Sequence, residues 1–332
     1  METSAEQLIT YRLYTEEDRE AILQLWKEES GWGAITVSQF DSWFLNTPYG
    51  KCLIVVAENE NKTIVGQIIY SPSRMIVNGN EIKTLRVSAP ILSSNFRQGN
   101  IRSDDHPVFL MMSEGFRIAY EAGYQYTYGF PALGWLALLR LFPKFLPNPS
   151  ETVSYDCFAI SLETPQTFKG LENTYTVKVA ESFTEEYDVL WNEAVQQMPV
   201  KCGIIRNAAW LNWISGGHLN LELRTTNENK LTGYMTVKKE SGLITDVFAT
   251  SIEDVEKVFN YVVSGLHYQN DKKITVDFTQ LKGMLTNITT PVVESIGYTK
   301  DNYRFAFSSY LLDTNIPFEK VQADQWYMTP MG

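Results

Sequence analysis

The feature that most constrains the fold of this chain is an internal repeat, because a duplicated unit must fold twice in the same way. Residues 9–29 and 175–195 both read as a short strand followed by an amphipathic helix that begins with Thr-Glu-Glu. Each helix has a threonine as its predicted N-cap and a tryptophan expected on the same helix face. These residues are Thr15 and Thr184 for the caps, and Trp26 and Trp191 for the tryptophans.

The sharpest match between the two halves is a β-hairpin. Residues 53–71 and 221–239 each contain two apolar runs around Asn-Glu-Asn-Lys, and a glycine follows the turn at Gly66 and Gly233. Asn tolerates left-handed backbone angles, so an Asn-rich turn between alternating runs predicts an antiparallel hairpin. We therefore expect the same hairpin at the same place in both halves.

The halves also share the order of the elements that follow the hairpin, which is strand, helix, strand, short helix and strand. The expected elements are residues 83–92, 107–122, 124–130, 134–142 and 153–162 in the first half, and 242–250, 252–268, 273–278, 288–296 and 303–312 in the second. This order predicts an α/β fold with a mixed (α+β), mostly antiparallel twisted sheet flanked by helices in each half.

The repeat sets the predicted domain boundaries as well. We expect an N-terminal domain at residues 1–163, a C-terminal domain at 174–313 and a C-terminal tail at 314–332. The tail is predicted to be a surface strap anchored by Trp326 and Tyr327. Two domains suit a chain of 332 residues with 44% hydrophobic and 20% charged residues, which is typical of globular proteins.

Charge and composition restrict the partners and the location. The net charge of -11 argues against DNA or RNA as a partner, because phosphate binding uses clustered Lys and Arg, and it favours an amine acceptor. Residues 1–16 have neither the basic nor the apolar region of an export signal, so a cytoplasmic location is predicted. The apolar stretch at 132–146 is too short to span a bilayer and predicts a buried helix.

Neither a metal site nor a disulfide framework is expected. The cysteines are odd in number and far apart, and the histidines have no ligand spacing. The residues are Cys52, Cys157 and Cys202, and His106, His218 and His267. The cysteines are predicted to be reduced thiols in the core.

The element order, found twice, resembles the GCN5-related N-acetyltransferase (GNAT) superfamily in its double-domain form, over nearly the whole chain. Residues 88–101, SAPILSSNFRQGNI, look like the family's fourth strand and acyl-CoA loop. A helix at 107–122 and a strand ending in Tyr-Gly-Phe-Pro at 128–131 follow in the family's order. In the second half, RNAAWLNW and the glycine-bearing hairpin are similar to double-domain members.

The resemblance implies acetyl-CoA or another acyl-CoA as co-substrate, no metal, and a small-molecule amine acceptor, in a monomer or homodimer. Two strands would splay apart to hold the pantetheine arm, and backbone N–H groups after the first strand would bind the pyrophosphate. The amine would attack the thioester directly, assisted by a backbone oxyanion donor, a base and an acid. The residues implied for CoA binding are Ile91, Leu92, Ser93, Arg97, Gln98, Gly99, Asn100 and Arg102.

The loop departs from the family pattern of Gln or Arg, two residues, Gly, one residue, and Gly or Ala. After Arg97 the first glycine, Gly99, comes one position early and the second small residue is missing. Asp104 and Asp105 stand where the helix should begin, and carboxylates there would repel a pyrophosphate unless arginines offset them. The equivalent place in the second half has neither Gly nor Arg, so that half is predicted to have lost the CoA site.

Four residues are candidates for the chemistry: Tyr128, Arg86, Ser88 and Asp246. Tyr128 ends a strand beside the expected wedge, either as the acid for the leaving thiolate or as a tyrosine packed at a sheet end. Alternation in strand 83–92 puts Arg86 and Ser88 on one face, opposite Leu85, Val87 and Ala89. Arg86 either holds an acidic acceptor or pairs with a carboxylate across the domain interface, and Asp246 is either a base or a structural carboxylate.

The loop at 31–33, Gly-Trp-Gly, is expected to line the acceptor pocket with Trp32 and Gly33, although Trp32 could equally cap the core. The predicted function is an acyl-CoA-dependent N-acyltransferase, with acetyl as the expected group, in which the first half binds CoA and the second half walls off the acceptor. One alternative is a Fem-type aminoacyl transferase, but the acidic charge makes tRNA unlikely as a donor. Another is a non-catalytic protein of this fold that binds a ligand or partner.

Overall fold

The computed structural model describes residues 8–97, 105–131, 149–161, 174–198, 200–238, 244–251, 253–255, 257–258, 275–278, 299–313, 326–327 and 329. Two compact units contain them. The first unit comprises Met1–Arg74, Ile82–Ser154 and Ala306–Phe318, and the second comprises Met75–Glu81, Tyr155–Phe305 and Glu319–Gly332. The predicted short helices at 134–142 and 288–296 lie outside the described residues, as does the segment 164–173 between the two predicted domains.

The first unit is a mixed sheet with the strand order β1-β2-β3-β4-β5-β13. The strands are β1 (Ile9–Leu13), β2 (Leu53–Asn59), β3 (Ile64–Val77), β4 (Asn80–Leu92), β5 (Tyr126–Gly129) and β13 (Thr299–Leu311). Its helices are η1 (Glu16–Asp18), α1 (Arg19–Glu29), α2 (Val37–Phe40), η2 (Asp41–Leu45), η3 (Ser94–Phe96) and α3 (Pro107–Glu121). Only the β4–β5 pair is parallel among the pairs with a defined register in this unit.

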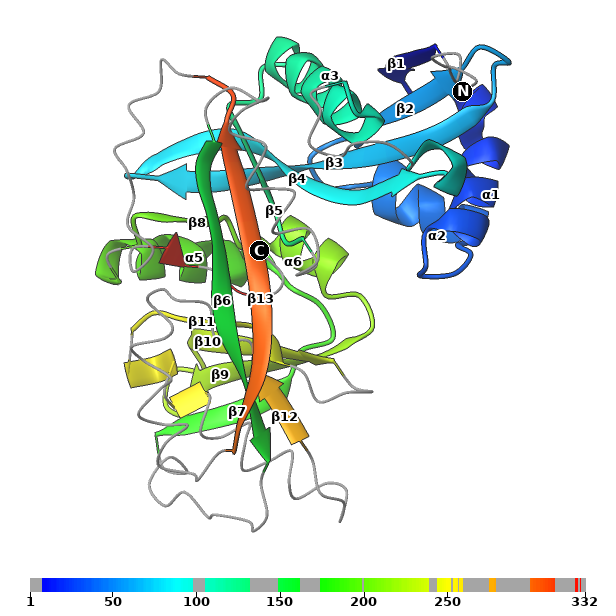
Figure 1. The fold of residues 1–332 in the computed structure, drawn as a ribbon. Helices are drawn as coiled ribbons and strands as arrows, with labels where there is room; N and C mark the ends of the chain where they lie inside the picture. Colours follow the sequence, from blue (N-terminus) through cyan, green and yellow to red (C-terminus); the bar gives the residue numbers. More distant parts are fainter. Residues whose placement is uncertain are drawn as a thin grey trace. The chain divides into compact units, whose positions relative to one another are not determined.

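Helices cover both faces of this sheet, with α3 on one side and α1 and α2 on the other (Figure 1). The α3 side has a core that includes Ile68, Leu85 and Met112. Gly115 lets α3 approach β3 closely, because a Cβ there would lie 2.3 Å from the Tyr70 hydroxyl. The core on the other side includes Trp26, which is buried as its repeat position predicts.

The second unit repeats this plan. Its strand order is β6-β12-β11-β10-β9-β7. These strands are β6 (Pro149–Ser161), β7 (Tyr175–Val179), β9 (His218–Thr225), β10 (Leu231–Lys238), β11 (Ile244–Ala249) and β12 (Thr275–Phe278), with helices α5 (Glu185–Gln197) and α6 (Ala208–Ile214). The tail strand β14 (Trp326–Tyr327) pairs in parallel with β8 (Cys202–Ile204), and Tyr327 is fully buried, so the tail is anchored in the core of this unit.

The last strand of each half pairs with the sheet of the other half. Residues 308–311 of β13 pair with β5, and residues 158–161 of β6 pair with β12. Both strands form close to where the sequence predicts them, but periodicity alone carries no information on the partner strand. The compact units are therefore not continuous segments of the chain, and the predicted boundaries at 163 and 174 describe the duplication rather than the packing.

Both predicted hairpins are confirmed, with antiparallel β2–β3 and β9–β10 pairs. The identical Asn-Glu-Asn-Lys turns differ in detail, because the left-handed residue is Lys62 in the first and Asn229 in the second. Gly66 and Gly233 have the same role: a Cβ would meet Leu92 at 2.9 Å or Ala249 at 2.9 Å, on the next strand of each sheet. The glycines thus keep the third and fourth strands of each repeat close.

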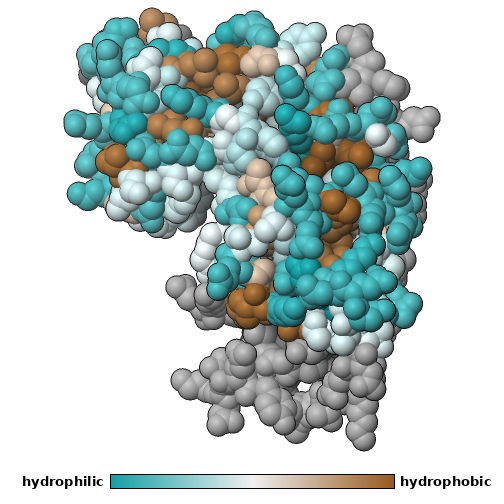
Figure 2. Space-filling model, turned by 180° about the vertical axis from the view of Figure 1, so that it is seen from behind, coloured by the Kyte–Doolittle hydropathy of each residue, from teal (hydrophilic) through white to brown (hydrophobic). Residues whose placement is uncertain are grey.

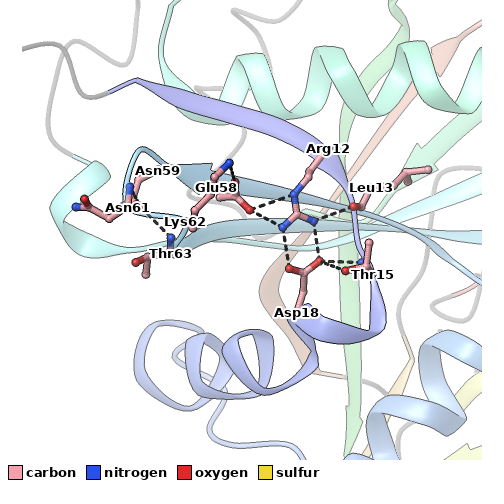
Figure 3. A network of polar contacts seen from close by, with 9 residues as sticks. All are labelled: Arg12, Leu13, Thr15, Asp18, Glu58, Asn59, Asn61, Lys62 and Thr63. Carbon is pink, nitrogen blue, oxygen red and sulfur yellow. Dashed lines mark hydrogen bonds and ion pairs between the residues drawn. The ribbon is translucent and has the colours of Figure 1, made fainter.

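The first hairpin is held to the helix start by charge pairs (Figure 3). Arg12 lies between Asp18 at 2.7 Å and Glu58 at 2.5 Å, and the Thr15 N–H donates to Asp18. The hydrogen bond from Arg12 is the main reason why the pKa of Asp18 lies below its usual value. Thr15 is the N-cap predicted from the sequence, as is Thr184 at α5, whose side chain makes no capping bond.

The visible surface is mainly hydrophilic, with separate hydrophobic areas (Figure 2). Among the tryptophans whose side chains the structure describes, Trp32 is the most exposed, at 65%. In the part of the chain that the structure describes, no helix has the length and apolar character needed to cross a membrane. Cys52 and Cys202 are buried, as predicted for core cysteines.

Candidate functional site

Strands β4 and β5 separate in the first unit. Their parallel register runs from Thr84–Tyr126 to Val87–Gly129, and β4 continues to Leu92 beyond it. The strands are still close at Gly129, where a Cβ would lie 3.0 Å from the Val87 carbonyl oxygen. Residues 88–92 of β4 therefore extend past the end of their pairing with β5, and the sheet opens at this point.

The backbone of β4 changes direction at the opening. Ala89 has a φ of 47°, a left-handed conformation that is uncommon for a residue with a side chain. Strict alternation predicted Ala89 on the face of Leu85 and Val87, and this is wrong: Ala89 packs with the core of the α1 side, whereas Leu85 and Val87 pack with that of the α3 side. Strained backbone of this kind is concentrated at functional sites.

A cavity of about 170 Å³ lies at the opening. It takes side chains from both faces of the sheet, because Ile68, Met112 and Tyr310 belong to the core of the α3 side while Trp32 contacts Trp26 on the other. Its described lining consists of Trp32, Ile68, Arg86, Val87, Ser88, Ala89, Pro90, Met112, Tyr128, Gly129, Phe130, Pro131, Ser308 and Tyr310. The cavity therefore joins the two faces where β4 and β5 part.

Tyr128 is 3% exposed and lines the cavity. Its register partner is Arg86, and the Ser73 hydroxyl donates to the Tyr128 oxygen at 3.4 Å. The ring makes an edge contact with Phe130 at 6.0 Å between centroids. Strand β5 and Ser73 thus hold the phenol of Tyr128 at the cavity. This position agrees with both interpretations of Tyr128, as a catalytic acid and as a packed tyrosine.

Arg86 and Ser88 both line the cavity, as does Trp32. The guanidinium of Arg86 stacks over the Phe130 ring, 5.3 Å from its centroid. Trp32 stands in a loop in which the Ser30 hydroxyl accepts from the Trp32 N–H and donates to the Gly33 carbonyl. Gly33, with a φ of 89°, supplies the left-handed backbone of this loop next to Trp32.

The turn after β4 is occupied by a carboxylate of the chain itself. Glu29, the last residue of α1, accepts from the Ser94 N–H at 3.0 Å and from the hydroxyls of Ser93 and Ser94. Arg97 forms an ion pair with Glu29 at 3.0 Å and donates to the Leu92 carbonyl. The Ser94 N–H, followed by the two hydroxyls and the charge of Arg97, lowers the pKa of Glu29.

The resemblance implies that Ser93 and Arg97 help to bind the pyrophosphate of CoA. In this structure Glu29 occupies both of them. The Ser93 N–H donates to Val65, and the side chains of Ile91 and Leu92 are buried in the cores of opposite faces. Gln98, Gly99, Asn100 and Arg102, which complete the implied CoA loop, lie outside the described residues. The helix that follows begins at Pro107, with His106 as its N-cap.

Asp246 lies in the second unit, in a fully buried ion pair with Arg206 at 3.1 Å. The Tyr234 hydroxyl also donates to this carboxylate at 2.6 Å. Both carboxylate oxygens accept from Arg206, and the guanidinium stacks near Tyr327 of the tail. This arrangement matches the interpretation of Asp246 as a structural carboxylate.

Sequence reasoning missed several residues of the cavity. Phe130 and Pro131 follow Tyr128 and Gly129, and their only signal was their place at the end of a strand that resembles the family's. Ile68 and Met112 carry no signal other than apolar alternation. Ser308 and Tyr310 come from β13, which belongs to the second half of the chain but pairs with β5 of the first. No sequence signal predicts that pairing, so none could place these two residues at the cavity.

Several solved structures have a similar overall fold, at low sequence identity. One is a protein of unknown function from Enterococcus faecalis V583, described as a probable N-acyltransferase, with 11% identity, a TM-score of 0.65, and coverage of 92% of this chain and 73% of that one. A GCN5-related N-acetyltransferase from Anabaena variabilis has 10% identity, a TM-score of 0.63 and the same coverages of 92% and 73%. N-myristoyltransferase from Saccharomyces cerevisiae with bound myristoyl-CoA and inhibitors has 10% identity, a TM-score of 0.56, and coverage of 94% and 82%.

The chain has the GNAT fold. The likeness covers more than nine-tenths of its length and confirms the fold predicted from the repeated element order. No protein-family model and no curated protein matches the sequence. At identities of 10–11% the likeness shows the fold alone, so activity must be argued from the site.

Proposed function

We propose that this protein is an acyl-CoA-dependent N-acyltransferase that acts on a small amine. The observation that supports this most is the cavity at the β4–β5 opening, which takes residues from both faces of one sheet. A donor approaching from one face and an acceptor from the other would meet there. Transfer by direct attack needs both substrates in one site with their reacting atoms in contact.

The described residues fit the reactive end of an acyl-CoA. When bound, an acyl-CoA supplies an activated thioester. Residues 88–92 offer a strand edge beyond the pairing with β5, and Ile68 and Met112 give the cavity an apolar wall for the acyl group. For the diphosphate, the described donors at Ser94 and Arg97 are engaged by Glu29, which would have to give way.

The residues around the opening have complementary roles in this proposal. The backbone N–H of Ser88 or Ala89 polarises the thioester carbonyl, since Pro90, the next residue of β4, has no N–H. Tyr128, positioned by Ser73, donates a proton to the departing sulfur. Trp32 covers the acceptor side of the cavity.

The size of the cavity favours a short acyl group. Its volume of about 170 Å³ is close to the ~150 Å³ of an engineered cavity that holds benzene. An acetyl group would fill part of this space and leave the rest for the reacting end of the amine. We therefore propose acetyl-CoA as the donor.

Thermal shift with acetyl-CoA, longer acyl-CoAs and free CoA tests the donor. Saturating ligand at about 100 times its Kd stabilises the native state by about 2.7 kcal/mol, so we expect a melting temperature raised by a few degrees. Release of the CoA thiol in the presence of amines then tests transfer. A protein that shows no shift with any of these compounds would instead be a non-catalytic binding protein with this fold.

A further inference from the structure

Arg86 gives the cavity a charge that acyl transfer does not require. Among the described lining residues it is the only charged one, and the others are apolar, aromatic or hydroxyl-bearing. The chain as a whole carries a net charge of -11. A guanidinium inside an apolar cavity of an acidic protein is therefore a local feature that selects for an anionic group.

The geometry of Arg86 suits a carboxylate ligand. Its guanidinium lies over the Phe130 ring, with Cζ 5.3 Å from the ring centroid. A guanidinium has five N–H donors, so it can bind a ligand in addition to a partner within the protein. Arg binds carboxylates in a planar, often bidentate arrangement that Lys cannot reproduce.

Arg86 stands on the acceptor side of the opening. Its neighbours in sequence, Leu85 and Val87, pack with the core under α3, so alternation turns Arg86 to the opposite face. Tyr128 is its register partner in β5 and shares that face. The wall on the α3 side, with Met112 among its residues, is apolar and suits an uncharged acyl group.

We infer that the amine acceptor also carries a carboxylate, bound by Arg86, so that the acceptor is a small amino acid or a similar amino carboxylate. This rests on the proposed acyl transfer. The cavity of about 170 Å³ limits the enclosed part of the acceptor to a compact skeleton. The net change is formation of an amide on the amine nitrogen, cleavage of the thioester C–S bond, and passage of the amine proton to the solvent and of a proton to the sulfur.

Matched acceptors test the inference: L-leucine against 3-methylbutylamine, and L-phenylalanine against 2-phenylethylamine, each with acetyl-CoA. The wild type should prefer the amino acids. In Arg86→Met, kcat/KM for the amino acids should fall on the order of 10- to 100-fold, as expected for a lost hydrogen-bonded charge contact. The values for the plain amines should change by less than about 3-fold, and Arg86→Lys should retain part of the preference.

Lys83→Met is the matched control, because Lys83 is an exposed cation on the same strand that does not line the cavity. It should keep the wild-type preference. Equal use of amines and amino acids by the wild type, or an equal loss for both in Arg86→Met, would overturn the inference. A third arm compares succinyl-CoA with butyryl-CoA: if Arg86→Met loses only the succinyl donor, the carboxylate belongs to the acyl group and the acceptor assignment is wrong.

Failure of the proposed function is distinguishable from failure of this inference. If no amine is acylated, acyl transfer is wrong, and calorimetric titration of L-leucine and L-phenylalanine into the wild type and Arg86→Met still tests the binding site. Binding that weakens on loss of Arg86 supports a carboxylate site, and absence of binding to the wild type overturns it. Phe130→Leu, which removes the stacking partner and keeps the charge, provides a second variant if Arg86→Met does not fold.

Discussion

At the scale of single residues, the proposed proton donor makes the most direct prediction. Tyr128→Phe removes one hydroxyl from the cavity and leaves the ring against Phe130 in place. Because an acid that protonates a leaving group typically contributes 10²- to 10⁴-fold, kcat should fall by about 10²-fold or more with the melting temperature nearly unchanged. Tyr126→Phe is the matched control: this buried tyrosine lies two positions earlier in β5, outside the cavity lining, and its loss should spare kcat.

A second prediction concerns stability rather than activity. Arg206 and Asp246 are both fully buried, and removal of one partner leaves an uncompensated charge in the core. Arg206→Met should therefore lower the free energy of unfolding of the second unit by about 3–5 kcal/mol, measured by urea denaturation. The double variant Arg206→Met/Asp246→Leu should recover much of that loss. A single variant as stable as the wild type would contradict this prediction.

At the scale of elements, the contact between α1 and the turn after β4 links the two sides of the site. Glu29 holds Ser94 and Arg97, and two residues later the chain enters the loop with Trp32. If a CoA diphosphate takes these donors, the carboxylate opposes it. Glu29→Gln removes that charge at constant size, so CoA should bind about 3- to 10-fold more tightly at low salt, measured by calorimetry.

Pantetheine, which carries no phosphate, is the control ligand for Glu29→Gln, and its affinity should be unchanged. An unchanged or weaker affinity for CoA would mean that the phosphates bind away from Ser94.

Strand β4, which precedes this turn, shows a limit of period-two reasoning. Alternation placed Leu85 and Val87 together on one face but failed at Ala89, because a single left-handed residue in β4 reverses the order of faces.

At the scale of the whole molecule, the repeat predicted the fold because matching hairpins and caps are local features. Gly66 and Gly233 take equivalent positions, and Trp26 and Trp191 are both buried. The pairing of the final strands is not local, because β13 pairs with β5 and β6 pairs with β12, each in the other half of the chain. Ser308 and Tyr310 therefore reach the cavity of the first unit through a choice of partner that no segment of sequence encodes by itself.

This exchange predicts that neither half folds alone. A fragment of residues 1–163 lacks β13, so the edge of β5 is uncovered and Tyr310 is missing from the core on the α3 side. We expect this fragment to show no cooperative unfolding transition and no thermal shift with acetyl-CoA, because an uncovered edge also promotes aggregation. Coexpression with a fragment of residues 164–332 should restore both, since the second fragment supplies β13 and receives β6 in return. Cooperative unfolding and CoA binding by the first fragment alone would show that the exchanged strand is dispensable for the site.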